Sequence, residues 1–327
     1  MSVITEEKTI ELSKHLWESI YTDEPPKVFA ILDGSRDTSI ERMLNTSGLK
    51  YSCLYEGKLT YDLATAAPYI VELVQDHPFT YELIQKAWGN YWGIFAITHN
   101  QTSLATVRRN CRKIAYILNK SNKKFVFRYF DPRVMRVYLP TCTDLEAHKV
   151  FGPVTDFVME TKDRENLHRF VRTNLGIVDI SNNDMPESVI LRAKTRAAKF
   201  NILKLRDEQF QAFKEDILEK DYQSIKTQFI NDFVEDPQAP VIVNQKPVPL
   251  DIFLRSCLKE ALKFKLNDHY NIYSFFHLNH THGWRFWELE ENAWAKSILE
   301  SPRKGEIKIE KLEQTFSSRL MDQLWSA

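Results

Sequence analysis

The chain has 327 residues, 43% hydrophobic and 27% charged, which is ordinary for a globular protein and more than most single cores hold. Lys and Arg total 44 against 44 for Asp and Glu, so no overall basic field exists to attract nucleic acid or an anionic membrane. The four cysteines are far apart and form no CxxC pair, which argues against a zinc ribbon and indicates reduced thiols in the cytoplasm.

The first half alternates between strand-like and helix-like segments. Its apolar runs predict strands, and its segments with three- and four-residue apolar spacing predict helices. The predicted strands are 28–34, 51–57, 68–74, 93–99 and 124–130, and the predicted helices are 9–21, 38–45, a helix opened by Pro78, and 103–119. This alternation favours an α/β or α+β lobe, in which helices cover a sheet of short strands.

The second half has mostly helical patterning and favours an all-helical lobe. The predicted helices are 206–219, 221–234, 250–264 and 306–325, with a proline-punctuated connection over 235–249. Between the halves lies a polar, charged stretch with few bulky apolar residues. We therefore expect three regions, namely 1–160 as the α/β lobe, 161–190 as a polar linker and 191–327 as the helical lobe.

An ordered set of motifs gives the first half its identity. The set consists of FAILDGS (29–35), LYEG (54–57), APYIVEL (67–73), WGIFA (92–96), LATVRRNCRKI (104–114), FRYFDPRVM (127–135) and FGPV (151–154). In this order the motifs resemble the type VI secretion effector adaptors, a family whose domain was long catalogued as one of unknown function (DUF4123). The segments ILKLRDEQF (202–210) and THGWRFWEL (281–289) resemble the helical lobe of that family more loosely.

The resemblance implies a two-lobed binding protein in the cytoplasm of a Gram-negative bacterium. Such an adaptor grips the N-terminal segment of a toxic effector and brings it to the spike protein VgrG or to its PAAR tip. No enzyme activity, cofactor, metal, nucleic acid or stable membrane insertion is expected. The N-terminus has no secretory signal pattern, and no apolar run reaches the roughly 20 residues that span a bilayer.

The FRYFDPR motif supplies the first candidate site. Asp131 is expected to cap a short helix that Pro132 opens, and Arg128 and Arg133 to bond a carboxylate such as Asp33 or Glu56. These arginines either lock the end of the sheet or contact the effector. Candidate partner contacts are Arg128, Arg133, Asp33, Tyr55, Arg112, Trp284, Phe286 and Trp287, and candidate structural residues are Asp131, Pro132, Gly34 and Gly57.

Two other functions stay open at this point. His277, His280 and His282 lie close together in a predicted loop and could serve a metal-dependent hydrolase, although they match no hydrolase signature such as HExxH. The basic segment 104–124 carries no acidic residue and could serve a nucleic-acid or regulatory module, although no aromatic residues are interleaved on its helix. The aromatic residues of THGWRFWEL either pack in a core or anchor an effector helix.

Overall fold

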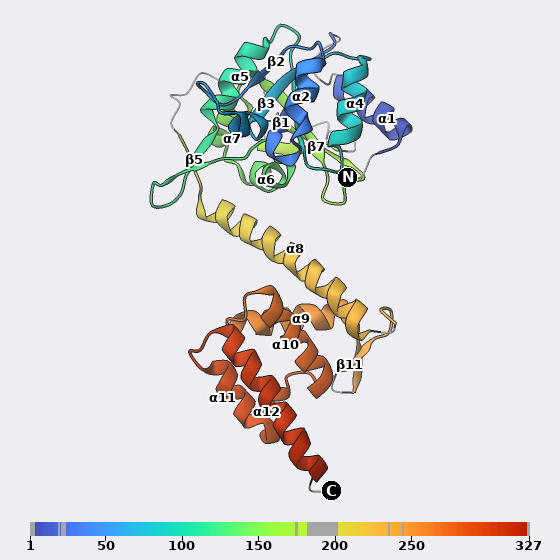
Figure 1. Cartoon of the computed structure of the whole chain (residues 1–327), viewed down its shortest axis with the longest axis vertical. Coiled ribbons are helices and arrows are strands. Elements are labelled where there is room, and N and C mark those ends of the chain that lie inside the picture. Colours follow the sequence, from blue (N-terminus) through green and yellow to red (C-terminus); the bar gives the residue numbers. More distant parts are fainter. Residues whose placement is uncertain are drawn as a thin grey trace. The chain divides into compact units, whose positions relative to one another are not determined.

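The computed structural model describes residues 4–18, 20, 24–173, 176–181, 202–234, 236–243 and 245–325. The chain divides into two compact units, residues 1–214 and 215–327 (Figure 1). The division falls inside a single long helix, α8 (Asp207–Phe233). Each unit has a hydrophobic core of its own.

A seven-stranded sheet forms the centre of the N-terminal unit, in the spatial order β2-β3-β1-β4-β7-β8-β9. Its strands are β1 (Lys27–Asp33), β2 (Tyr51–Cys53), β3 (Pro68–Leu73), β4 (Gly93–Thr98), β7 (Val154–Glu160), β8 (Leu167–Thr173) and β9 (Gly176–Asp179). All neighbouring strands in it are antiparallel. The architecture is therefore α+β, and the alternation of strands and helices in the sequence does not produce the parallel crossovers of an α/β fold.

Strand β1 lies in the interior of the sheet, and both of its faces are buried. Ala30 is opposite Val71 of β3 on one side and Phe95 of β4 on the other. Phe29 and Ile31 enter one core cluster, whereas Val28, Ala30 and Leu32 enter the other. Burial on both faces explains why this strand reads as a continuous apolar run rather than an alternating one.

Helices cover both faces of the sheet. Residues of α1 (Glu6–Trp17), α2 (Ser39–Thr46) and α4 (Pro78–Ala87) pack on one face. Residues of α5 (Leu104–Lys113), α6 (Pro132–Tyr138) and α7 (Asp144–Phe151) pack on the other. Short turns complete the unit, namely α3 (Tyr61–Thr65), η1 (Gly34–Arg36) and η2 (Leu139–Thr141).

A second sheet of three short strands follows α5, in the order β10-β5-β6. Its strands are β5 (Tyr116–Leu118), β6 (Lys124–Val126) and β10 (Leu203–Lys204). The helix predicted over 103–119 is therefore too long at its C-terminal end. The polar turn after Leu118 favours a hairpin, because Asn122 adopts φ 59° and the Asn119 side chain accepts from the backbone N–H of Lys123 at 2.9 Å.

The polar stretch expected to link two domains, 161–190, contributes to the sheet in its described part. Strand β8 pairs with β7 and with β9, so the sheet continues to Asp179. The residues 182–190 lie outside the described residues. Arg169 is 2% exposed although its segment reads as polar, because the buried carboxylate of Asp156 pairs with it.

The C-terminal unit is mainly helical. After α8 its elements are β11 (Val241–Val243), β12 (Lys246–Val248), α9 (Leu250–Lys263), α10 (His269–His282), η3 (Phe286–Glu288), η4 (Glu290–Asn292), α11 (Ala293–Glu300) and α12 (Gly305–Trp325). The expectation of an all-helical lobe needs one correction, because β11 and β12 form an antiparallel pair within the proline-punctuated connection. The two helices predicted over 206–219 and 221–234 are one continuous helix, since neither Gly nor Pro separates them.

No helix in the described ranges combines the length and the apolar character that crossing a membrane requires.

Candidate functional site

Asp33 ends strand β1 and lies at the centre of the first group of charged residues. Its side chain is 2% exposed. One carboxylate oxygen accepts from the hydroxyl of Ser35 at 2.7 Å and from its backbone N–H at 3.1 Å. The other accepts from Arg128, whose guanidinium also donates to the Ser35 hydroxyl at 3.0 Å. Asp33 is therefore held by the segment that follows its own strand and by the FRYFDPR motif.

Asp131 is the second buried carboxylate and caps helix α6. Its Oδ1 accepts from the backbone N–H of Arg133 at 3.0 Å, with Pro132 at the first helical position. Its Oδ2 accepts from Arg133 Nη2 and from Arg36 Nη2, both at 2.7 Å. Burial raises the pKa of Asp131, and the charges of Arg36 and Arg128 oppose that rise. Arg36 thus lies between both carboxylates, because its Nε is 3.8 Å from Asp33.

These ion pairs fasten the end of β1 to the start of α6. Gly34 belongs to the same junction, since a Cβ atom there would come within 2.4 Å of the Ala67 carbonyl oxygen. The pairing differs from the expectation in one respect, because Glu56 is bound by Arg112 and not by Arg128 or Arg133. Arg128 and Arg133 nevertheless keep exposed side-chain fractions of 45% and 35%, so part of each guanidinium faces solvent.

The arginines of helix α5 hold the loop after β2. Arg112 donates to the backbone carbonyls of Leu54 at 3.1 Å and Tyr55 at 2.7 Å, and pairs with Glu56 at 3.1 Å. Arg108 donates to the carbonyl of Cys53 at 3.3 Å. This face of the basic helix is therefore occupied by the protein's own backbone, which leaves it poorly placed to contact phosphates. Gly57 lies in this loop with φ +84°.

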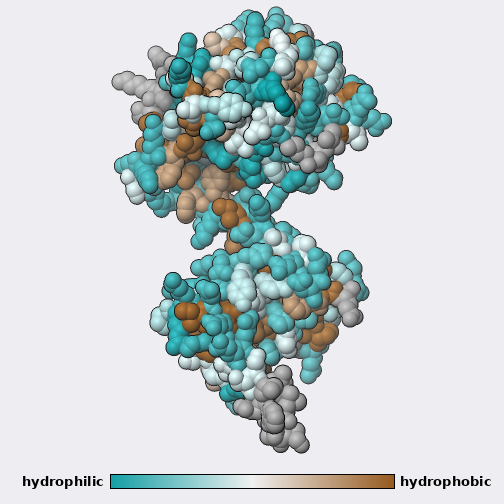
Figure 2. Space-filling model, in the orientation of Figure 1, coloured by the Kyte–Doolittle hydropathy of each residue, from teal (hydrophilic) through white to brown (hydrophobic). Residues whose placement is uncertain are grey.

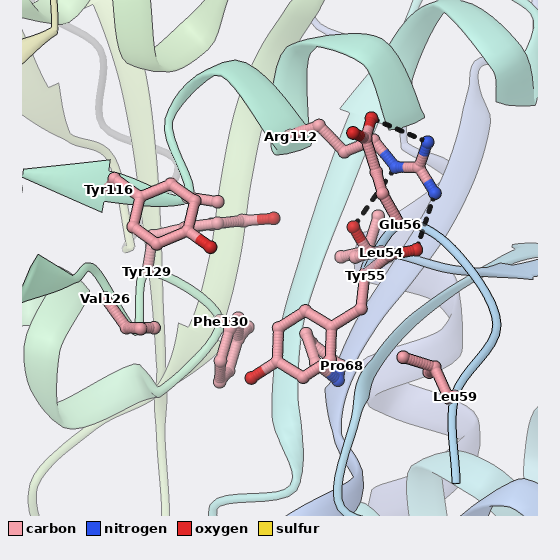
Figure 3. Close-up of a pocket in the computed structure, with 11 residues that line it drawn as sticks. Leu54, Tyr55, Glu56, Leu59, Pro68, Arg112, Tyr116, Val126, Tyr129 and Phe130 are labelled. Atoms are coloured by element: carbon pink, nitrogen blue, oxygen red, sulfur yellow. Dashed lines mark hydrogen bonds and ion pairs between the residues drawn. The ribbon is translucent and has the colours of Figure 1, made fainter. Parts of the chain in front are cut away.

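A pocket of about 390 Å³ opens between this loop and the β5–β6 hairpin. The residues that line it are mostly apolar or aromatic, namely Leu54, Tyr55, Glu56, Leu59, Pro68, Arg112, Ala115, Tyr116, Val126, Tyr129 and Phe130. Figure 3 shows Tyr116 and Val126 on one side and Tyr55 and Leu59 on the other. Such a concave, apolar site with a few polar groups is typical of a binding site.

Tyr129 gives the pocket a buried polar group. Its side chain is 1% exposed, and its hydroxyl has no hydrogen-bond partner among the described residues. Burial, followed by the neighbouring Cys111 thiol, raises the pKa of Tyr129 well above its usual value, so the hydroxyl keeps its proton. A buried donor of this kind is costly unless something bonds to it.

The aromatic residues after α10 are divided between core and surface. Phe286 and Trp287 are 0% and 3% exposed and belong to the core of the C-terminal unit. In this unit they expose almost no surface to a partner, so their burial favours the core-packing alternative over direct contact with an effector. Trp284 is half-buried, packs edge-on against Phe253 and lies under the guanidinium of Arg285.

The three clustered histidines lie in the last turns of α10, not in a loop, and Gly283 follows them with φ +92°. His277 stacks on Phe233, His280 lies edge-on to Phe229, and His282 stacks on Phe316 with ring centroids 3.6 Å apart. Three different aromatic neighbours hold the rings apart. Across the part of the chain that the structure describes, no three His, Cys, Asp or Glu side chains come together as metal ligands would.

The sequence motifs led to the FRYFDPR motif and to Tyr55, but not to the pocket as a whole. Tyr116 was missed because 103–119 reads as one helix. Val126, in the strand predicted over 124–130, was missed because that strand then had no hairpin partner. The missed signal is the pair of short segments rich in β-branched and aromatic residues on either side of the asparagine-containing turn 119–122, which is typical of a hairpin. In the antiparallel register Tyr116 is directly opposite Val126, so both side chains lie on one face.

Comparison with known proteins gives one family match. Residues 28–149 match the model of the domain of unknown function DUF4123, the domain to which the sequence motifs point. Searches of curated proteins and of solved structures find no match.

Proposed function

We propose, from the DUF4123 domain at residues 28–149, that this protein is an adaptor that binds a cognate type VI secretion effector and helps load it onto the VgrG spike or its PAAR tip. The family is associated with adaptors of such effectors. In this proposal the protein acts in the cytoplasm by binding and release, and it catalyses no reaction. The effector contributes a segment, probed most simply at its N-terminus, that the adaptor covers until loading.

One observation supports this function above the others. The pocket between the 54–59 loop and the β5–β6 hairpin is formed entirely by residues of the DUF4123 domain. Its walls are apolar and aromatic, and ion pairs and backbone hydrogen bonds hold the elements around it in place. A preorganised apolar site suits the binding of a peptide segment, since the adaptor itself needs little further ordering on association.

The energetics fit a holding role. Burial of apolar surface contributes about 25 cal/mol per Å², and a stable interface buries about 1,200–2,000 Å² in total. The pocket alone is too small for such an interface, so it would serve as an anchor within a wider contact. An effector segment that is apolar enough to aggregate when free would gain most from this cover.

The test is a co-purification from cells that express the genes on either side of this one. The full-length tagged chain is expected to recover a neighbouring toxin, with VgrG or a PAAR protein, in stoichiometric amount. Recovery of none of them from cells shown to express all of them would refute the adaptor function. The same co-purification with an Arg128→Ala chain, in which the pocket is unaltered, tests whether the partly exposed guanidinium contacts the effector.

A further inference from the structure

We infer that the pocket holds an extended segment of the effector in which a large apolar side chain is flanked by carboxylates. This inference rests on the proposed function and adds the place and the chemistry of the contact. We call the pocket with its β6 margin the hairpin pocket, formed by the 54–59 loop, Pro68, Tyr116, Val126, Tyr129 and Phe130.

The apolar part of the inference comes from the pocket walls. The aromatic rings of Tyr55, Tyr116 and Phe130 face the cavity, and Val126 stays 52% exposed at its margin (Figure 3). Figure 2 shows apolar residues gathered on this unit around the place that β5 has in Figure 1. A volume of about 390 Å³ is enough for anchoring side chains of a bound segment.

The extended conformation follows from the free edge of β6. This strand is the outermost of its three-stranded sheet, and all three of its residues are exposed. Toward β5, Phe127 donates to the Ala115 carbonyl at 2.9 Å and the Lys123 carbonyl accepts from Asn119 at 3.0 Å. Because backbone groups alternate along a strand, those of Lys124 and Val126 point away from β5. They are available to pair with an added strand, as in recognition by β-augmentation.

The acidic part follows from the charges around the pocket. Lys124 places its ammonium 3.8 Å from the centroid of the Tyr116 ring, whereas the guanidinium of Arg128 is already paired with Asp33. The acidic group in the lining, Glu56, is already paired with Arg112. The margin is therefore cationic toward an incoming chain, and carboxylates on that chain complement it. The buried Tyr129 hydroxyl offers one donor to a carbonyl or carboxylate that reaches it.

Two neighbouring residues of β6 allow a matched test. Val126 lines the pocket, whereas Phe125 is 44% exposed and lies on the opposite face, since it pairs with the buried Ile117. The probes are overlapping 12-residue fluorescent peptides that tile the proteins encoded on either side of this gene, measured by anisotropy against the full-length chain. We expect Val126→Glu to weaken the best peptide at least tenfold and Phe125→Glu to change it less than twofold.

A second pair tests the charge. Lys124 lies over Tyr116 on the pocket face, and Lys123 lies over Phe125 on the other, 5.5 Å from its ring centroid. We expect Lys124→Gln to reduce affinity about threefold to tenfold and Lys123→Gln to leave it unchanged. Added salt should weaken the wild-type complex and have less effect on Lys124→Gln, because exposed charges are screened. The bound peptides should share an apolar residue next to Asp or Glu.

The outcomes separate the two proposals. If intact effector co-purifies equally with wild-type, Val126→Glu and Phe125→Glu chains, the adaptor function stands and the hairpin pocket is the wrong site. If the peptides that bind are basic, the charge assignment is overturned. If wild-type chain binds neither intact neighbour nor any peptide, the proposed function fails and this inference fails with it. Unchanged circular dichroism of each variant shows that a lost complex is not lost folding.

Discussion

The two units of the molecule differ in where their strongest ion pairs lie. In the N-terminal unit the side chains of Asp156 and Arg169 are 0% and 2% exposed and form an ion pair at 2.7 Å. In the C-terminal unit the largest buried groups are aromatic, including Phe275, Phe276 and Phe286 at 0%. Its best-connected ion pairs, around Arg255, are at the surface, where that side chain is 45% exposed.

The two units therefore specify their structures in different ways. A buried ion pair is directional, and removal of one partner leaves a charge without compensation. It therefore fixes which chain segments meet, as Arg36 does between Asp33 and Asp131. An aromatic core is specified mainly by volume and tolerates exchanges that conserve it. Substitutions that remove a charge should therefore lower the free energy of unfolding by very different amounts in the two units.

The largest effect is expected from Arg169→Met. Arg169 pairs with Asp156 and donates to the carbonyls of His15 at 3.2 Å and Glu18 at 2.8 Å, at the end of α1. Its loss leaves Asp156 buried and unpaired, so the free energy of unfolding should fall by about 3–5 kcal/mol. Urea denaturation measures this. Arg169→Met combined with Asp156→Leu should recover much of the loss, and a loss below about 1 kcal/mol for the single variant would contradict the comparison.

The next effect is a pH dependence at Glu160. This carboxylate is 3% exposed and accepts from the backbone N–H groups of Gly89 and Tyr91, the latter at 2.9 Å. Burial raises its pKa from 4.5 to about 7, against the effect of those hydrogen bonds. Because the folded pKa lies above the unfolded value, the resulting stability is complete below pH 4.5 and is lost as pH rises through 7.

The loss in this pH window amounts to roughly 3 kcal/mol for such a shift. Urea denaturation of wild-type chain at a series of pH values should show it, whereas Glu160→Gln should be flatter from pH 4.5 to 7. The exposed Glu165→Gln serves as control and should follow wild type. Identical pH profiles for wild type and Glu160→Gln would mean that Glu160 titrates normally.

A smaller effect is expected at the buried lysine of the aromatic unit. Lys308 is 2% exposed, and its ammonium donates to the carbonyls of Phe264 at 2.9 Å and Leu299 at 2.7 Å, which end α9 and α11. Lys308→Met leaves both carbonyls without this donor. It also removes an ammonium group whose pKa is lowered by burial, which offsets part of the loss. The balance is a loss of about 1–2 kcal/mol in the free energy of unfolding. Exposed Lys304→Met should cost less than about 0.5 kcal/mol, and equal losses would refute the capping role.

The smallest effect is expected at the surface of the same unit. Arg255 pairs with both oxygens of Glu219, at 2.9 and 3.0 Å, and with Asp251 at 2.9 Å. Because the group is exposed, Arg255→Ala should cost at most about 1 kcal/mol, and less at high salt. A loss as large as that of Arg169→Met, measured in the same urea experiment, would remove the distinction between the two units.

The sequence predicted β1, β3 and β4 to within one residue, because each is an apolar run closed by a turn or by Gly. The strands predicted over 51–57 and 124–130 are shorter in the structure and end at Cys53 and Val126. The same logic placed Asp131 at a helix start, since Asp-Pro restricts the backbone locally. It failed for β8, where Arg169 makes the segment read as polar and only its distant partner Asp156 explains its burial. The sequence pattern within one segment cannot show which residue outside that segment will pair with a buried charge.

The site was predicted less completely than the fold. FRYFDPR, FAILDGS and LYEG contain Arg128, Asp33 and Tyr55, respectively. Arg36, which lies between Asp33 and Asp131, was not singled out as a candidate. The histidines of α10 were read as a loop because their polar spacing hides a helix whose stabilising contacts are aromatic. The hairpin pocket needed tertiary structure, since its two walls are separated by nearly half of the matched domain.

The extent of the sheet has a practical consequence for anyone who expresses parts of this protein. A fragment cut to the family match at residues 28–149 would end before β7, which pairs with β4 through Phe95, Ala96 and Ile97. It would expose an apolar strand edge of the kind that recruits other chains and aggregates. A fragment that retains the complete seven-stranded sheet must extend at least through Asp179. It must also include α1, whose Leu12 and Leu16 cover one face of the sheet.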